Sequence, residues 1–296
     1  MQQAEIPKSI NNWLLMLSPY QVLVFSFLGL ILVGAFLLML PIASNDGSSL
    51  SFIDALFTAT SAVCVTGLIV VDTGQYFSTF GQLVIIMLIQ IGGFGVMTMT
   101  TVFALILGKR IQLRSRLIAQ ESLNRLTVGG VVKLIKLLVK TTLCIEFIGG
   151  VLLSFRLYPD YGLHGIYMAF WHSISAFCNA GFDILGSQSL IGYQGNVLVN
   201  LVIAGLIISG GLGFIVWVDL RTSWHKYKEN FKVFQLKRYI SALSVHTKIV
   251  LIMTTFLIVS GMMIILALEF DNPATLGPLD WPQKVLASFF QSTTLR

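Results

Sequence analysis

The chain of 296 residues carries five long apolar runs, separated by shorter and more polar connections. The runs extend over approximately residues 22–40, 80–107, 131–155, 197–218 and 249–268. A helix needs about 20 consecutive apolar residues to cross the hydrocarbon core of a bilayer. The pattern therefore predicts an all-α polytopic membrane protein with one spanning helix in each run.

Two shorter apolar segments, residues 50–60 and 164–175, lie in the connections between these runs. Each could form a helix, but neither is long enough to cross a bilayer. Each leads into a stretch of small residues that ends in glycine, at Gly67 and at Gly181. A half-helix that returns as extended backbone is a re-entrant loop, which a membrane tolerates only where the backbone is buried in protein or lines a cavity. We therefore expect both loops to face water or ions.

The half-helices and their loops belong to an internal repeat of about 115 residues. Ser61–Cys64 aligns with Ser175–Cys178 at an offset of 114, and the loop glycines align at the same offset. In the runs that follow, Gly92–Gly95 aligns with Gly210–Gly213 at an offset of 118. We expect these later glycines to allow close helix packing rather than to act as hinges.

The repeat divides the chain into six predicted segments. In order, they are a cytoplasmic or interfacial N-terminus (1–18), a first pore unit (19–110), a cytoplasmic linker (111–130), a second pore unit (131–220), a basic cytoplasmic linker (221–248) and an incomplete third pore unit (249–296). The third unit has its spanning run, an outer loop and a short helical stretch from about residue 281 to 293, and it stops before any loop glycine.

Charge is scarce and unevenly distributed along the chain. Only 11% of the residues are charged, against about 25% in an ordinary soluble domain, which excludes a soluble globular protein. Fifteen of the 19 lysines and arginines lie in residues 109–140 and 221–248, whereas residues 41–79 and 159–195 contain none. The positive-inside rule therefore places the N-terminus and both basic stretches in the cytoplasm. These stretches either set the topology alone or also bind a cytosolic partner or anionic lipid; nucleic acid is not an expected partner.

Residue types that could perform catalysis or bind a metal are few. The three cysteines, Cys64, Cys144 and Cys178, lie among apolar residues and are expected to be free thiols. His164 and His172 are eight residues apart and lack the His-Glu-x-x-His pattern of a metal site. We therefore expect no catalytic residue and no enzyme activity.

One carboxylate, Glu146, lies inside an apolar run. It is a functional candidate, because the charge of a carboxylate is expensive to bury in a membrane. The side chain could equally be neutral, or paired with a group on another helix. The sequence leaves these two interpretations open.

Half-helices with glycine-ended loops can surround an axis with backbone carbonyls. Such carbonyls replace the hydration shell of an ion and thereby select it. Glycine at the end of the loop permits backbone angles that direct successive carbonyls the same way. Val65, Thr66 and Gly67 partly match the potassium-channel filter sequence TVGYG. The repeated loops therefore predict a cation-selective pore.

The residues of both loops resemble a known family, the bacterial Trk/Ktr potassium transporters, and most of all the membrane subunit of Ktr systems. The resemblance covers essentially the whole chain. It is carried by Thr60–Leu68, Asp72–Gly74 and Gln90–Gly95 in the first repeat, by Ser175–Phe182 in the second, and by Gln291–Arg296 in the third.

This resemblance implies potassium uptake across the bacterial plasma membrane, through four pseudo-repeated units around one pore. It also implies a homodimer, a cytosolic ring of nucleotide-binding regulatory subunits and a dependence on Na⁺. No tightly bound cofactor is expected, because backbone carbonyls would hold K⁺ and the regulatory partner would hold the nucleotide. The filter residues that it assigns are Val63, Cys64, Val65, Thr66 and Gly67 in the first loop, and Phe177, Cys178, Asn179, Ala180 and Gly181 in the second.

The resemblance also sets expectations for single side chains and for the end of the chain. We expect Cys64 and Cys178 to pack within the protein rather than bind a metal, and Asn179 to form a hydrogen bond behind the filter. Members of the family carry a third filter, a gating loop and a fourth unit. We therefore expect this chain to be a fragment that cannot close a four-sided filter alone.

An alternating-access secondary transporter is the alternative function. Its broken helices would lie near the middle of the bilayer. The short helices of this chain lie in outer connections instead. That placement favours the channel-like pore.

Overall fold

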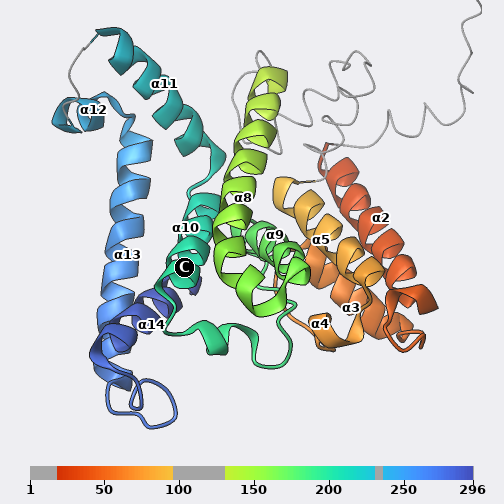
Figure 1. Cartoon of the computed structure of the whole chain (residues 1–296). Helices are drawn as coiled ribbons and strands as arrows, with labels where there is room; N and C mark the ends of the chain where they lie inside the picture. The colour runs from red at the N-terminus through yellow and green to blue at the C-terminus, as the bar shows by residue number, and fades with distance from the viewer. Residues whose placement is uncertain (1–18, 96–130, 231–235, 296) are drawn as a thin grey trace, which may run out of the picture. The chain divides into compact units, whose positions relative to one another are not determined.

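The computed structural model describes residues 19–95, 131–230 and 236–295 of the chain. These residues form helices and connecting loops, and their only β-type pairing is an isolated bridge between Ser44 and Phe77 (Figure 1). Two compact units are present. The first comprises Met1–Thr142 with Ala180–Phe182, and the second comprises Leu143–Asn179 with Asp183–Arg296.

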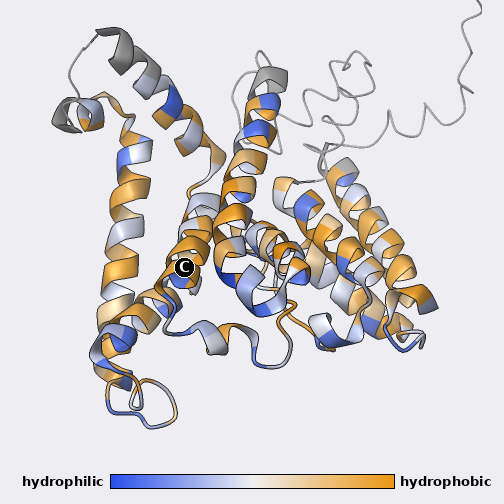
Figure 2. Cartoon of the chain, viewed as in Figure 1, coloured by the Kyte–Doolittle hydropathy of each residue, from blue (hydrophilic) through white to orange (hydrophobic). Residues whose placement is uncertain are grey.

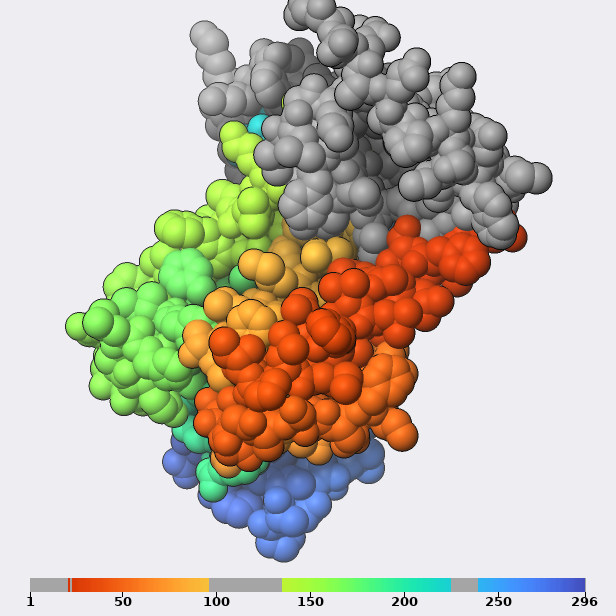
Figure 3. All heavy atoms as spheres, turned by 90° about the vertical axis from the view of Figure 1, so that its right-hand side faces the viewer, coloured from red at the N-terminus to blue at the C-terminus, as the bar shows by residue number. Residues whose placement is uncertain are grey.

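The first unit is built around a half-helix. Its elements are α2 (Pro19–Met39), η1 (Pro41–Ala43), α3 (Phe52–Val63), α4 (Thr73–Tyr76) and α5 (Thr79–Phe94). The half-helix α3 packs against both α2 and α5, which also contact each other. Figure 3 shows α2 and the segments that follow it, in red to orange, on one face of this unit. The unit therefore holds α3 between longer apolar helices.

The second unit contains the longest helices of the described chain. Its elements are α8 (Val131–Tyr161, which begins in the first unit), α9 (Leu163–Phe177), η2 (Ser189–Tyr193), α10 (Val197–Gly211), α11 (Phe214–Asn230), α12 (Leu236–Ala242), α13 (Val245–Glu269) and α14 (Trp281–Thr294). Helix α10 packs against the half-helices α9 and α14, and α14 also packs against α13. Two half-helices therefore share one supporting helix.

Polar residues at helix N-termini fix where several helices begin. The side chain of Ser51 accepts a hydrogen bond from the Asp54 amide at 3.2 Å, and this starts α3. Asn196 caps α10 by accepting from the Val199 amide at 3.0 Å. Such caps satisfy amides that have no partner inside the helix. They explain why these helices begin where the polar connections end.

Hydrophobic residues occupy much of the length of the helices, as the orange parts of the ribbon in Figure 2 show. Two described helices are long and apolar enough to cross a membrane, at Ile135–Tyr161 and Val245–Glu269. The pair α10 and α11 would be a third span if it crosses despite its bend of 94°. Large side chains such as Phe36 and Phe147 are exposed on these surfaces. An apolar surface of this extent fits a polytopic membrane protein.

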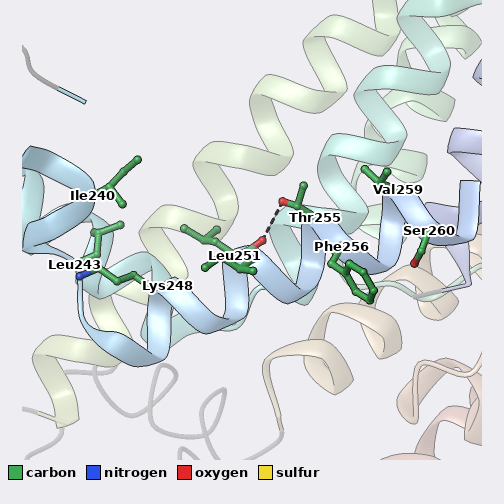
Figure 4. A pocket seen from close by; sticks show the side chains of 9 residues that line it. Ile240, Leu243, Lys248, Leu251, Thr255, Phe256, Val259 and Ser260 are labelled. Carbon is green, nitrogen blue, oxygen red and sulfur yellow. Dashed lines mark hydrogen bonds between the residues drawn. The ribbon is translucent and has the colours of Figure 1, made fainter. Parts of the chain in front are cut away.

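Helix α13 carries a shallow apolar groove of about 640 Å³ where it meets α12 (Figure 4). Aliphatic and aromatic side chains line it, and Lys248 lies at one end. The Thr255 hydroxyl donates to the Leu251 carbonyl of the same helix at 2.9 Å, so its polar group is already bonded. The groove thus has the apolar character of the rest of the α13 surface.

All five apolar runs and all three short segments contain helices, but two runs differ from the expected continuous span. In the second run, helix α5 ends at Phe94, and its C-cap residue Gly95 has a φ of 80°. The fourth run breaks between Gly211 and Phe214, where Gly213 has a φ of 82°. Helix α11 then continues across residue 220, where the sequence predicted the second pore unit to end. The predicted segments 1–18 and 111–130, and the end of the second run, lie outside the described residues.

Candidate functional site

The first candidate loop follows directly from the end of α3. Cys64 caps the helix, Val65 has a φ of 57°, and Gly67 has a φ of 78°. The amide of Thr66 donates to the Ser61 carbonyl at 2.9 Å, and its hydroxyl bonds the Ser61 hydroxyl at the same distance. The loop is therefore folded back on the last turn of its half-helix.

The second candidate loop repeats this backbone path at the end of α9. Cys178 caps the helix, Asn179 has a φ of 58°, and Gly181 has a φ of 72°. These two positive φ angles fall at the positions that correspond to Val65 and Gly67 in the repeat. Because positive φ is uncommon for residues other than glycine, its recurrence at matched positions indicates a shared backbone geometry.

The two loops meet within the first compact unit, to which Ala180–Phe182 belong. A Cβ atom added to Gly67 would lie 2.5 Å from the Ala180 carbonyl oxygen and 3.3 Å from the Cα of Gly181. Position 67 thus requires glycine for two reasons, its positive φ and this close approach to the second loop. The structure brings together the two glycines that the sequence predicted to end the filter segments.

Glycines of the next helices lie directly behind both loops. A Cβ on Gly92 of α5 would overlap the Val63 carbonyl, and a Cβ on Gly210 of α10 would overlap the Phe177 carbonyl. The prediction of close packing is confirmed at these two positions. The last glycines of the two sets, Gly95 and Gly213, instead end their helices, which the packing interpretation did not anticipate.

Glu146 lies behind the second half-helix and is only 4% exposed. Its backbone carbonyl accepts a hydrogen bond from the Ser173 hydroxyl of α9 at 2.7 Å. Three and four residues further along α8, Gly149 and Gly150 lie against side chains of α9 and α10. The carboxylate is close enough to Cys178 to interact with it electrostatically. Glu146 therefore faces the protein interior near the second loop and not the lipid.

The other predicted side chains take different positions. All three cysteines are free, as expected. The expected packing does not hold for Cys64, which is exposed, while Cys178 is half-buried. Asn179 is also exposed, and its amide nitrogen would lie 3.2 Å from a Cβ placed on Gly210. No group of three or more His, Cys, Asp or Glu that could hold a metal is found in the described ranges.

One buried residue of the second half-helix was missed as a functional candidate. His172 is 5% exposed, and its ring bonds the Met168 carbonyl and the Ile184 amide. In the sequence, His172 is a candidate only for metal binding, and its spacing from His164 does not fit a metal site. Its position on the buried face of an amphipathic half-helix was the available signal, but its partner Ile184 lies beyond the loop.

The connection that precedes the first half-helix carries an ionised carboxylate. The Ser48 hydroxyl and amide donate to Asp46 at 2.7 and 3.0 Å. These hydrogen bonds hold the pKa of Asp46 below its ordinary value, because they stabilise the charged form. Asp46 is fully exposed, so this connection presents a negative charge to solvent.

Together, these features define an all-helical membrane protein built from repeats of a long helix, a half-helix with a left-handed glycine loop, and a second long helix. Comparison with known proteins identifies the family of the chain. Residues 8–296 match the family model of TrkH, described as a cation transport protein. The chain belongs to this family.

Curated relatives match nearly all of the chain. The Ktr system potassium uptake protein B of Bacillus subtilis is 46% identical over 280 residues, which are 94% of this chain and 59% of that protein. The potassium/sodium uptake protein NtpJ of Enterococcus hirae is 41% identical over 95% of this chain and 59% of its own length. A Ktr system potassium uptake protein B of Vibrio alginolyticus is 42% identical over 93% and 58%. The chain therefore spans just under three fifths of the length of these relatives.

Proposed function

We propose that this chain forms part of a potassium-uptake pore in the bacterial plasma membrane, and that residues 63–67 and 177–181 are two segments of its selectivity filter. The observation that carries the proposal is the meeting of the two loops at Gly67 and Gly181, with positive φ angles at matched positions. The names of two relatives, which specify potassium uptake, support the choice of ion.

Selection by such a filter needs carbonyl oxygens at fixed positions and no bond making. An ion enters after losing part of its hydration shell, and the carbonyls replace the lost water. The close contacts of Gly92 and Gly210 with the carbonyl ends of the half-helices would keep those carbonyls in place. The chain would then act without a resident cofactor, with K⁺ as its cargo.

The proposal also includes a role for Na⁺ and an assembly with other subunits. A relative named for both potassium and sodium uptake supports a role for Na⁺, as a coupling ion or as a second cargo. Relatives named as proteins of a Ktr system support a multi-component assembly. We assign the basic segment 221–248 to the contact with a cytosolic nucleotide-binding subunit, and expect the membrane subunit to form a homodimer.

An alternating-access transporter is the second candidate, because α10 and α11 form a helix pair broken by 94°. Transport by alternating access saturates at a rate set by conformational turnover, on the scale of microseconds to seconds per cycle. A pore is faster. Single-channel recording in bilayers would therefore separate the two, since only the pore gives resolvable unit currents.

The uptake proposal is tested in bacteria that lack their own potassium-uptake systems. The cells express the 296 residues, or a chimera in which these residues replace the matching part of the Bacillus subtilis relative. We expect growth on low potassium with at least one of the two forms. Failure of both, with each protein detected in the membrane, would overturn the proposal.

The filter assignment has its own test, the substitution Gly67→Ser in the form that restores uptake. The added side chain meets the Ala180 carbonyl and strains a left-handed backbone, so we expect weaker selection of K⁺ over Na⁺. Gly205→Ser is the matched control, because nothing lies within 4 Å of a Cβ at Gly205. Unchanged uptake kinetics for both ions in Gly67→Ser would remove the filter assignment.

A further inference from the structure

The two loops are fastened to their half-helices by different side chains. In the first loop, the Thr66 hydroxyl bonds the Ser61 hydroxyl at 2.9 Å. The position that corresponds to Thr66 in the second loop is Ala180, which has no hydroxyl, although Ser175 corresponds to Ser61. The side chain of Ala180 therefore cannot form the hydroxyl bond that Thr66 forms in the first loop.

His172 supplies a bond of another kind to the second loop. Its Nδ1 lies 2.6 Å from the Met168 carbonyl oxygen, and its Nε2 lies 3.3 Å from the Ile184 amide nitrogen. The carbonyl can only accept and the amide can only donate. Both bonds therefore form only with the neutral imidazole protonated at Nδ1. His172 thus joins the half-helix to the segment that leaves the loop.

The exit of the second loop is buried, and this makes the bond necessary. Phe182 and Ile184 are 3% and 6% exposed. The position that corresponds to Ile184 in the first repeat is Val70, which is exposed. A buried amide without an acceptor is costly, whereas an exposed amide bonds water. The first loop can therefore leave its half-helix without an imidazole, and the second cannot.

We propose that His172 is a positioning residue for the second filter segment and, through it, for the discrimination of K⁺ from Na⁺. This inference rests on the proposed function of residues 177–181. His172 acts from behind the loop, by fixing the backbone three residues beyond Gly181. The two filter segments are then held by different chemistry, a hydroxyl pair in one and a neutral imidazole in the other.

The test compares three substitutions in the form of the protein that restores uptake. His172→Leu removes both bonds, His172→Asn can retain only the bond to Met168, and His172→Gln can reach the Ile184 amide with its carbonyl oxygen. His164→Leu is the matched control, because His164 is exposed in the first turn of the same half-helix.

We expect His172→Leu and His172→Asn to raise the KM for K⁺ and to lower the K⁺/Na⁺ uptake ratio by about tenfold, the effect of one unpaired buried amide. His172→Gln should retain most of the ratio, and His164→Leu all of it. Uptake is normalised to the amount of protein in the membrane, so that a loss of folded protein alone does not change KM or the ratio.

The outcomes separate this inference from the filter assignment. Equal ratios for His172→Gln and His172→Asn would overturn the positioning role, as would a His172→Leu protein that is less abundant but has unchanged KM and ratio. If Gly67→Ser lowers the ratio while all His172 variants leave it intact, the filter assignment stands and only the role of His172 falls. If Gly67→Ser has no effect, the filter assignment itself falls.

Discussion

Val65 is the most unusual residue of the first loop, because it is β-branched and has a positive φ. Such a conformation costs about 1–3 kcal/mol and persists only where neighbouring contacts enforce it. The neighbour Thr66 supplies these contacts, with an amide and a hydroxyl that both bond Ser61. Local strain at this position is thus balanced by two short bonds to the half-helix.

The substitution Thr66→Val tests this balance, because it removes the hydroxyl and keeps the shape of the side chain. We expect a loss of about 0.5–1.5 kcal/mol in stability and a lower K⁺/Na⁺ uptake ratio, since the strained loop loses one of its bonds. The measurement is the apparent melting temperature of the purified protein, together with competitive ion uptake in cells.

Thr60→Val is the control for this prediction. Thr60 is exposed on the same half-helix, and its hydroxyl donates to the Leu56 carbonyl of that helix at 2.7 Å. The control should leave the ion ratio unchanged. Equal ratios for the two variants would mean that the Thr66 hydroxyl does not hold the loop.

At the scale of elements, the contact of a half-helix with the next long helix depends on glycine. Gly210 of α10 leaves no room for a Cβ atom beside the Phe177 carbonyl, whereas Gly205 of the same helix has nothing within 4 Å. Gly205 lies in the middle of α10 and Gly210 in its last turn. In a helix interior, alanine is intrinsically favoured over glycine by about 0.5–1 kcal/mol. Substituting alanine at each position therefore separates the effect of the packing contact from the effect of helix propensity.

Gly210→Ala is expected to displace the half-helix from α10, and so to lower the melting temperature by several degrees and impair uptake. Gly205→Ala should leave uptake intact and raise the melting temperature slightly. Parallel melting curves and uptake assays on the two variants provide the measurement. A Gly210→Ala protein that melts and transports like Gly205→Ala would show that the contact is not needed.

The bend between α10 and α11 is a second feature of this scale. Gly213 has a φ of 82°, and the Trp217 indole of α11 donates to the Ser209 carbonyl of α10 at 2.9 Å. The indole satisfies a carbonyl that the broken helix leaves without its usual partner. The bend is therefore fixed by a side chain and is not a loose hinge.

Gly213→Ala and Trp217→Phe should each destabilise the protein by about 1 kcal/mol, through backbone strain in one case and a lost hydrogen bond in the other. Because both act on the same bend, their effects should not add in the double variant. Denaturation of the wild type, the single variants and the double variant measures this coupling. Full additivity would contradict a shared role.

The sequence predicted most elements but neither break. The half-helices and their loops were predictable, because a short apolar segment followed by small residues and glycine has few other structures in a membrane. Hydropathy continues without interruption across Gly95 and Gly213, so it could not reveal that the helices end there. The burial of His172 on an amphipathic half-helix was predictable, but its contact with Ile184 was not, because the folded loop brings the two residues together.

At the scale of the whole molecule, the charge distribution predicts the orientation of the chain in the membrane. The basic stretches 109–140 and 221–248 are predicted to stay in the cytoplasm. Each compact unit taken alone agrees with a simple alternation, since a half-helix follows a long helix at the end opposite its basic side, as α14 follows α13. The proposed filter loops would then open to the outside, and the ionised Asp46 would lie on the same side.

This orientation predicts which positions an impermeant thiol reagent can reach. In a background with the three native cysteines replaced by serine and uptake retained, Ser49→Cys and Ala274→Cys should react with an impermeant maleimide in intact cells, because both positions are exposed in connections that are predicted to lie outside. Ala242→Cys, exposed at the end of α12 in the basic segment, should react only after the cells are permeabilised. Rapid labelling of Ala242→Cys in intact cells would show that the topology is the reverse of the predicted one. The proposed filter loops would then open to the cytoplasm, which would contradict their proposed role in taking up ions from outside.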